Sequence, residues 1–335
     1  VDDPGNRDDQ DERGNPGALN TSIAIQIHLR AEDIMKVGFV GLGIMGAPMA
    51  GHLQKGGHDL YLHDLAPDLP TDLLAGGAIA CDSNKAVAEA ADVVILMVPD
   101  TPDVEAALFG TNGVADGLRA GQLVIDMSSI SPTATTNFAA RINDLGCLYL
   151  DAPVSGGSVG AIDAKLTIMV GGPQAAFDRA LPLFELMGGT VTLIGTRNGD
   201  GQVCKAANQI IVGVTVQAVA EALVLAAKAG ADPAKVRQAL MGGAASSMIL
   251  ENHGARMLEG NFEPGFRAEL QQKDLNVALS AARDLGVVLP LAATAESLYN
   301  ALNARGQAKA DHSAVVTVLE ELAAVQVSPT KENQS

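Results

Sequence analysis

The stretch Lys36-Val-Gly-Phe-Val-Gly-Leu-Gly-Ile-Met-Gly-Ala-Pro-Met49 decides the fold. Its apolar start predicts a strand over residues 37–40, and the residues after the last glycine predict a helix. Gly41 permits a tight turn, Gly43 lets a pyrophosphate approach the backbone, and Gly46 lets helix and strand pack closely. We expect the whole turn to bind a dinucleotide, through Gly41, Leu42, Gly43, Ile44, Met45 and Gly46.

An acidic residue completes this pattern. Residues 59–64 predict a second strand that ends in Asp64, about 20 residues beyond the glycines, as a dinucleotide site requires. A carboxylate there accepts hydrogen bonds from the ribose hydroxyls and repels a 2′-phosphate, and residues 65–67 bring no arginine. The sequence therefore predicts NAD, with NADH preferred and NADP still possible. A solvated aspartate beside an ordinary glycine turn is the alternative.

The composition favours a protein that acts on small molecules. With 335 residues the chain is long enough for two domains, and its net charge of -17 argues against nucleic acid or an anionic membrane as a partner. Three cysteines without metal-like spacing indicate a reducing, cytoplasmic setting. We find no His, Asp or Glu cluster with ligand spacing and no run as long as a membrane span, so we expect no metal and no membrane contact.

Short apolar runs alternate with helical patterns from residue 35 to about residue 195. The strands expected are 37–40, 60–63, 79–80, 93–98, 123–126, 148–150, 167–170 and 191–193. The helices expected between them are 48–55, 84–91, 101–108, 132–145 and 173–187. This alternation predicts an α/β fold, a Rossmann-type doubly wound and largely parallel sheet, with ligands at the carboxyl ends of the strands.

The pattern changes after residue 201. One long alanine-rich helix is expected over 202–229, followed by helices over 233–241, 249–259, 270–285, 291–304 and 313–324. We therefore divide the chain into a disordered or non-native leader (1–34), a nucleotide-binding domain (35–196), an all-helical domain for substrate and oligomerisation (197–328) and a tail (329–335). Apolar and other residues alternate over 23–29, so an extra edge strand there is an alternative to the disordered leader.

Several loops carry candidate chemistry. Val98-Pro99 and Ser128 follow two neighbouring strands and should line the nicotinamide ribose, unless they are ordinary helix-capping turns. Ser155-Gly156-Gly157 can aim successive N–H groups at a carboxylate, although a flexible turn has the same composition.

Lys205 lies near the start of the long helix and shares a face with Asn208, three residues on. A lysine on an apolar helix usually reaches out to water. If it is buried instead, its pKa falls and it becomes a proton donor near neutrality. Lys273 is a second basic candidate, with a surface pair to Asp274 as its plain alternative.

Together these segments resemble the β-hydroxyacid dehydrogenase family over residues 35–325. The resemblance rests on residues 41–49, 151–157 and 201–208 and on the Lys273-Asp274 pair. It implies an active site in the cleft between the two domains, and dimers or tetramers. By motif position it implies a catalytic Lys205, a substrate site of Ser155, Gly156, Gly157 and Asn208, and a cofactor side that includes Lys273 and Phe266.

Three further segments, 126–132, 261–267 and 310–314, are most similar to family members that reduce a short 2-hydroxy-3-oxo acid. Members that act on a branched 3-hydroxy acid are the nearest alternative. A dinucleotide-binding protein without catalysis is a remote one, because a proton donor is present. Imine reductases of similar architecture usually lack this lysine.

Overall fold

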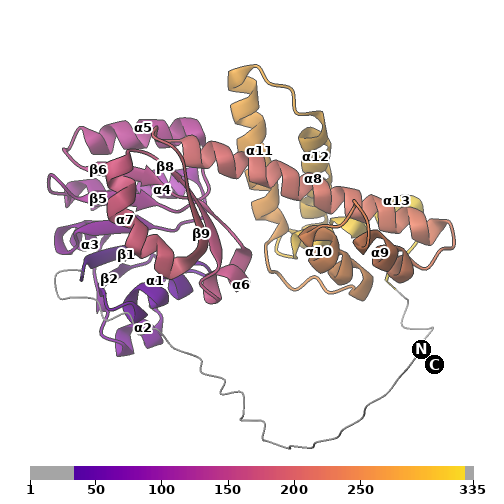
Figure 1. The fold of residues 1–335 in the computed structure, drawn as a ribbon, viewed down its shortest axis with the longest axis horizontal. Helices are drawn as coiled ribbons and strands as arrows, with labels where there is room; N and C mark the ends of the chain where they lie inside the picture. The colour runs from indigo at the N-terminus through magenta and orange to yellow at the C-terminus, as the bar shows by residue number, and fades with distance from the viewer. Residues whose placement is uncertain (1–33, 329–335) are drawn as a thin grey trace, which may run out of the picture.

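The structure, a computed structural model, describes residues 34–328. The first half of this part is a nine-stranded sheet flanked by helices (Figure 1). Its strands are β1 (Lys36–Val40), β2 (Asp59–His63), β3 (Ile79–Ala80), β4 (Val93–Leu96), β5 (Leu123–Asp126), β6 (Leu148–Asp151), β7 (Val154–Ser155), β8 (Leu166–Gly171) and β9 (Gly188–Gly195). They lie in the order β3-β2-β1-β4-β5-β6-β8-β7, with β9 paired to β8.

The six strands from β1 to β6 are all parallel. Every residue of β4 and β5 is buried, which explains their continuous apolar sequences, since helices cover both faces of such a sheet. The strand order reverses between β1 and β4, and the crevice at the carboxyl ends of these two strands is where ligands bind in doubly wound sheets. The predicted fold class is confirmed.

The far edge of the sheet departs from the prediction of a largely parallel arrangement. β8 runs antiparallel to β6 and to β7, a two-residue strand too short to predict. β4 also ends at Leu96, two residues before the predicted end of this strand. The reason is local: the N–H of Val98 donates to Ser128 Oγ at 3.0 Å, so the chain has turned away from the sheet.

The helices of this half are α1 (Gly46–Lys55), α2 (Thr71–Ala75), α3 (Asn84–Ala90), α4 (Thr101–Phe109), α5 (Pro132–Asn143), α6 (Gly157–Ile162) and α7 (Gln174–Met187). The five predicted helices are present, whereas α2 and α6 are too short to show a helical period. Asp100 starts α4 with a reciprocal capping box, and Ser131 caps α5. The possible edge strand at 23–29 lies outside the described residues.

Helix α8 (Asp200–Lys228) leaves the sheet and runs through the second half of the molecule (Figure 1). The other helices there are α9 (Pro233–Met241), α10 (Met248–Glu259), α11 (Ala268–Leu285), α12 (Pro290–Leu302) and α13 (Val316–Ala323), with short turns at Asn303–Gln307 and His312–Val315. Their shared core includes the buried side chains of Leu223, Leu275 and Tyr299.

The expectation that no run reaches the length of a membrane span is wrong for α8. By length and composition this helix could cross a membrane, and it has an 18-residue window of mean hydropathy 2.1. Its start is instead fastened to the sheet, because Asp151 accepts the N–H groups of Gly199 at 2.7 Å and Gln202 at 3.0 Å. Only 44% of the window is buried, so α8 also presents apolar side chains at the surface.

Candidate active site

The glycine turn has the shape that a dinucleotide needs. A side chain at Gly46 would lie 1.9 Å from the carbonyl oxygen of Gly41, which explains the glycine between strand and helix. At Gly43, by contrast, an added Cβ would have no described atom within 4 Å. The start of α1 is capped by none of the described side chains, which leaves its N–H groups available to a pyrophosphate. These residues therefore fit the predicted cofactor.

Asp64 lies at the end of β2, directly beside this turn. Its carboxylate accepts the N–H of Leu42 at 2.5 Å and that of Ala66 at 2.7 Å. The next side chain, Leu65, is 93% exposed and carries no charge that could offset a 2′-phosphate. The geometry thus holds a carboxylate in a fixed position where an adenosine ribose would lie.

The two loops after β4 and β5 are joined by Ser128, which is fully buried. Its hydroxyl accepts the N–H of Val98, and its carbonyl accepts the side-chain amide of Gln202 at 2.7 Å. The Ser128 side chain therefore braces the two loops from inside, and the expectation that the backbones of these loops line the cofactor site stays a prediction. Val98 and Pro99 remain partly exposed there.

Lys205 is buried, with 7% of its surface exposed. Its ammonium donates to Gln209 Oε1 at 3.1 Å, one helical turn further on. Burial lowers its pKa to about 8; the charge of Asp274 acts to raise the pKa, and that of Lys273 lowers it further. The reading of this lysine as a side chain that reaches out to water is wrong. A lysine with a pKa near 8 has the acidity that proton transfer near neutral pH requires.

Asn208 and Lys205 converge on one acceptor. The Asn208 amide donates to Gln209 Oε1 at 2.7 Å, and the Lys205 ammonium donates to the same oxygen. Gln209 is itself held by Asp274, whose Oδ2 accepts its Nε2 at 2.5 Å. The sequence reasoning missed Gln209, although its position four residues after Lys205 places it on the same face of the helix.

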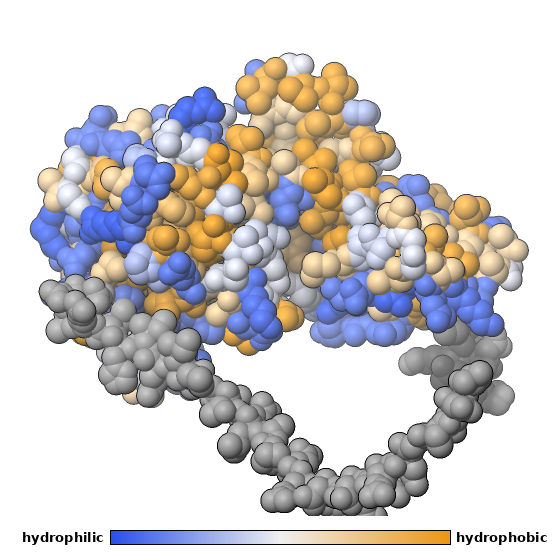
Figure 2. Space-filling model, in the orientation of Figure 1, coloured by the Kyte–Doolittle hydropathy of each residue, from blue (hydrophilic) through white to orange (hydrophobic). Residues whose placement is uncertain are grey.

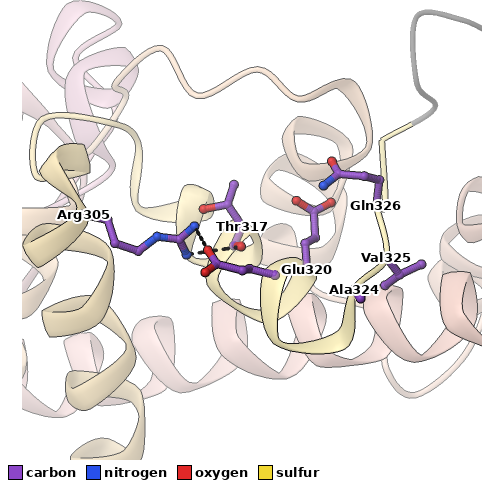
Figure 3. Close-up of a pocket in the computed structure, with 7 residues that line it drawn as sticks. Arg305, Thr317, Glu320, Ala324, Val325 and Gln326 are labelled. Atoms are coloured by element: carbon purple, nitrogen blue, oxygen red, sulfur yellow. Dashed lines mark hydrogen bonds and ion pairs between the residues drawn. The ribbon is translucent and has the colours of Figure 1, made fainter.

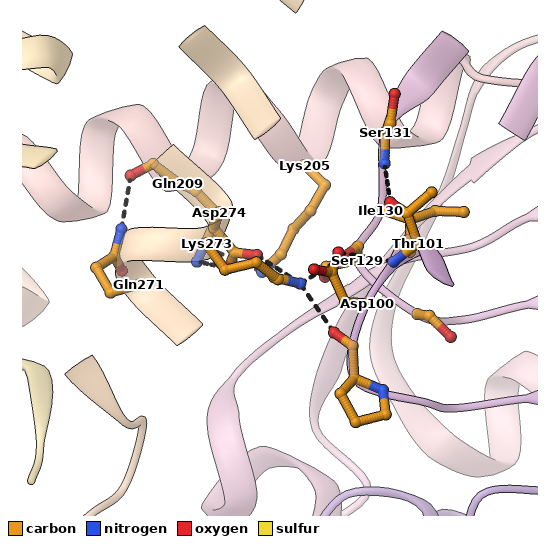
Figure 4. A network of polar contacts seen from close by, with 12 residues as sticks. Asp100, Thr101, Ser129, Ile130, Ser131, Lys205, Gln209, Gln271, Lys273 and Asp274 are labelled. Atoms are coloured by element: carbon orange, nitrogen blue, oxygen red, sulfur yellow. Dashed lines mark hydrogen bonds and ion pairs between the residues drawn. The ribbon is translucent and has the colours of Figure 1, made fainter. Parts of the chain in front are cut away.

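Lys273 joins the helical half to the sheet half. Its ammonium donates to the carbonyls of Pro99 at 3.0 Å and Ser129 at 2.6 Å, and it pairs with Asp274 at 3.0 Å (Figure 4). The plain alternative of a surface charge pair is therefore wrong, because both side chains are largely buried between the two halves. This contact brings Lys273 and Lys205 to the same cleft.

Ser155 ends β7, and the two glycines after it have backbone angles open to glycine, with φ of 136° at Gly156 and 61° at Gly157. A Cβ at Gly157 would lie 3.7 Å from the carbonyl oxygen of Gly265 in the helical half. Phe266, the expected neighbour of the nicotinamide, follows in that same turn. The proposed carboxylate turn and the Phe266 turn thus face each other across the cleft.

One hollow of the described chain lies away from these residues. This cavity of about 510 Å³ opens beside α13, where Arg305 pairs with Glu321 (Figure 3). It is lined by Arg305, Thr317, Glu320, Glu321, Ala324, Val325 and Gln326. None of the predicted site residues borders it.

Comparison with known proteins agrees with this geometry. Residues 36–195 match the NAD binding domain of 6-phosphogluconate dehydrogenase, and residues 199–319 match the NAD-binding part of NADP-dependent 3-hydroxyisobutyrate dehydrogenase. A 2-hydroxy-3-oxopropionate reductase of Escherichia coli is 54% identical over 289 residues, which cover 86% of this chain and 98% of the relative. The chain belongs to the β-hydroxyacid dehydrogenase family.

Other members of the family show how widely its substrates vary. A 2-(hydroxymethyl)glutarate dehydrogenase of Eubacterium barkeri is 37% identical and covers 89% of this chain and 99% of its own. A Mycobacterium tuberculosis 3-hydroxyisobutyrate dehydrogenase solved with L-serine has a TM-score of 0.78 at 34% identity, covering 85% of this chain and 99% of that one. This β-hydroxyacid dehydrogenase is therefore an NAD(P)-dependent oxidoreductase.

Proposed function

We propose that this enzyme reduces 2-hydroxy-3-oxopropionate (tartronate semialdehyde) to D-glycerate with NADH, reversibly, with Lys205 as general acid and base. The observation that carries the chemistry is the buried ammonium, held by Gln209 beside Asn208. The substrate assignment is supported by the Escherichia coli relative, which is 54% identical and is named for this reaction.

Each residue has a stated role. Backbone N–H groups of the Ser155–Gly157 turn bind the substrate carboxylate, and Asn208 orients a hydroxyl or the carbonyl. When bound, the reduced nicotinamide supplies the hydride. Lys205 stabilises the alkoxide that develops on the carbonyl oxygen and donates its proton to it. In the oxidative direction the neutral amine takes that proton back, which a pKa of about 8 permits.

A panel of substrates tests the assignment. Initial rates are measured with tartronate semialdehyde, D-glycerate, 3-hydroxyisobutyrate and 3-hydroxypropionate, each with both nicotinamide cofactors. We expect the first pair to give the highest kcat/KM. A higher value for 3-hydroxyisobutyrate would favour the second candidate, 3-hydroxyisobutyrate dehydrogenase, which the 34% identical mycobacterial structure supports.

Preference for NADH follows from the carboxylate of Asp64. Replacing it in Asp64→Ala removes the repulsion of a 2′-phosphate and frees the N–H of Leu42, so the ratio of kcat/KM for NADH over NADPH falls toward one. A native enzyme that uses NADPH better than NADH would contradict the proposal, whatever the variant does.

We also propose a dimer or tetramer, with a cytoplasmic location. Apolar side chains gather on the surface of the helical half (Figure 2). Exposed examples are Ile211 and Leu225 on α8, Val288 before α12 and Leu322 on α13, each at least 67% exposed. Patches of this kind on a soluble protein indicate an interface. Light scattering of the purified protein, compared with Leu225→Asp, tests this assembly.

A further inference from the structure

A cluster of polar side chains lies behind the active site, in the helical half. Asp311 is fully buried, and its Oδ2 accepts the N–H groups of Gly265 at 2.9 Å and Phe266 at 3.2 Å. Its Oδ1 accepts the N–H and the hydroxyl of Ser313, at 3.1 and 2.6 Å. Asp311 therefore holds the Phe266 turn that faces the proposed carboxylate site.

Two histidines connect this carboxylate to the catalytic helix. His253 Nδ1 lies 3.6 Å from Asp311 Oδ1, and His253 Nε2 lies 3.3 Å from His312 Nε2. His312 Nδ1 lies 3.3 Å from Gln271 Oε1, whose Nε2 donates to the backbone carbonyl of Gln209 at 3.3 Å (Figure 4 shows this last link). The contacts are continuous from Asp311 to the residue that binds the Lys205 ammonium.

The Gln209 carbonyl at the end of this chain sets the direction of each hydrogen bond in it. The carbonyl of Gln209 only accepts, so Gln271 turns its NH₂ group toward it and its oxygen toward His312. His312 Nδ1 must then carry a proton. His312 stays singly protonated, because burial and the charges of His253 and Arg256 lower its pKa to about 3 although Asp311 acts to raise it. Its Nε2 is therefore an acceptor.

This result sets the hydrogen-bond role of His253. Its Nε2 must donate to His312, and its Nδ1 faces the carboxylate of Asp311 at 3.6 Å. Arg256 lies 3.4 Å from Oδ2, the carboxylate oxygen that His253 does not face.

We propose that His253 and His312 are positioning residues of the active site. Their chain of contacts, from Asp311 and His253 through His312 and Gln271 to the Gln209 carbonyl, fixes the Phe266 turn relative to the Lys205 segment of α8. The proposal rests on the proposed role of Lys205 and deepens it. In this proposal the Phe266 turn and the Lys205 segment are held together by one set of polar contacts.

A metal ion is the competing occupant of this cluster. His253, Asp311 and His312 are ligand types, and their ligand atoms lie within 4.8 Å of one another. The guanidinium of Arg256 beside Asp311 opposes a divalent cation, and four donors already occupy the two carboxylate oxygens. The cluster is therefore better suited to hydrogen bonds within the protein than to a divalent ion.

Nitrogen-15 solid-state NMR of the histidine-labelled enzyme reads the protons directly. At pH 7.5 we expect a neutral His312 ring protonated at Nδ1 and a His253 ring with a proton on Nε2, assigned with the variants His253→Gln and His312→Asn. Finding His312 protonated at Nε2, or His253 without a proton there, would overturn the chain. This readout is independent of activity, so it stands apart from the proposed function.

Kinetics then separate positioning from mere support of the fold. His312→Leu breaks the chain, and we expect kcat/KM for tartronate semialdehyde to fall about 10- to 100-fold while the Kd for NADH stays unchanged. His312→Asn keeps a donor near the position of Nδ1 and restores kcat/KM to within about threefold of the wild type. Equal losses in both variants, or no loss in His312→Leu, would refute the role. If Lys205→Met remains active, the proposed function fails instead.

Discussion

Replacing the buried lysine should make the protein more stable while it destroys the activity. The pKa of Lys205 falls from 10.5 to about 8 on folding, mainly because the ammonium is buried. Since one pKa unit corresponds to about 1.4 kcal/mol, the folded state holds this charge at a cost of about 3 kcal/mol at neutral pH. Lys205→Met keeps the length of the side chain and removes the charge.

Lys205→Met loses few stabilising contacts. The variant gives up one hydrogen bond to Gln209, worth about 1 kcal/mol, and the Gln209 oxygen keeps its bond from Asn208. We therefore expect the free energy of unfolding to rise by about 2 kcal/mol at pH 7. Reduction of the substrate should fall by about 10²- to 10⁴-fold, the usual scale for a lost general acid.

The stability gained by removing a buried charge depends on pH, whereas a gain from better packing does not. Between about 8 and 10.5 the unfolded chain keeps a proton that the folded wild type has released, so wild-type stability rises with pH in this window. The advantage of Lys205→Met should shrink over the same window and become a loss of about 1 kcal/mol near pH 10.5, where only the missing hydrogen bond remains. Below pH 8 the advantage should be constant.

Urea unfolding at pH 7 and pH 10, at one fixed protein concentration, measures the effect. Lys228→Met is the matched control, because this lysine belongs to the same helix and is exposed. We expect it to change stability by less than about 0.5 kcal/mol at either pH. Loss of stability in Lys205→Met at pH 7, or a gain that does not depend on pH, would refute the reasoning that this ammonium is held in a desolvated site.

Other measurements probe the same cleft. Log kcat for reduction should fall as pH rises above about 8, where Lys205 loses its proton. Asp274→Asn should move this fall to lower pH, because the Asp274 charge raises the pKa of Lys205. Lys273→Met should move it to higher pH, because the Lys273 charge lowers that pKa. Shifts of equal direction in the two profiles would contradict this assignment. Gly43→Ala should fold normally and raise the Kd for NADH at least about tenfold in fluorescence titrations, since the added methyl group occupies open space that the pyrophosphate needs. Gly46→Ala should instead lower the melting temperature, because its Cβ meets the carbonyl of Gly41, and a normal melt would count against the packing argument.

The sheet and the long helices could be predicted because their signals are local. The apolar runs of β1, β4 and β5 and the glycine turn before α1 follow from neighbouring residues alone. The antiparallel pairing of β7 with β8 could not be predicted, since two residues carry no period and the partner is chosen by the rest of the sheet.

The candidate site could likewise be predicted only where its signals are local. Lys205 and Asn208 were predicted together because they are three residues apart on one helix. Gln209 lies on the same helix and its position could have been used, whereas its contact with Asp274 of α11 could not be predicted, because it joins two elements far apart in the sequence. His253 is likewise far from His312 in the sequence, so spacing alone gave no indication of the cluster that the fold assembles.

The attachment of α8 to the sheet has a consequence for how the substrate range of such an enzyme can change. Asp151 binds the first turn of this helix, and Lys205 follows one turn later on the same rigid rod. Lys205, the proposed proton donor, is therefore tied by its own backbone to the nucleotide-binding half. Segments beyond Pro233 that do not contact Lys205 or Gln209 can be reshaped to admit a longer or branched acid without moving this lysine relative to the sheet.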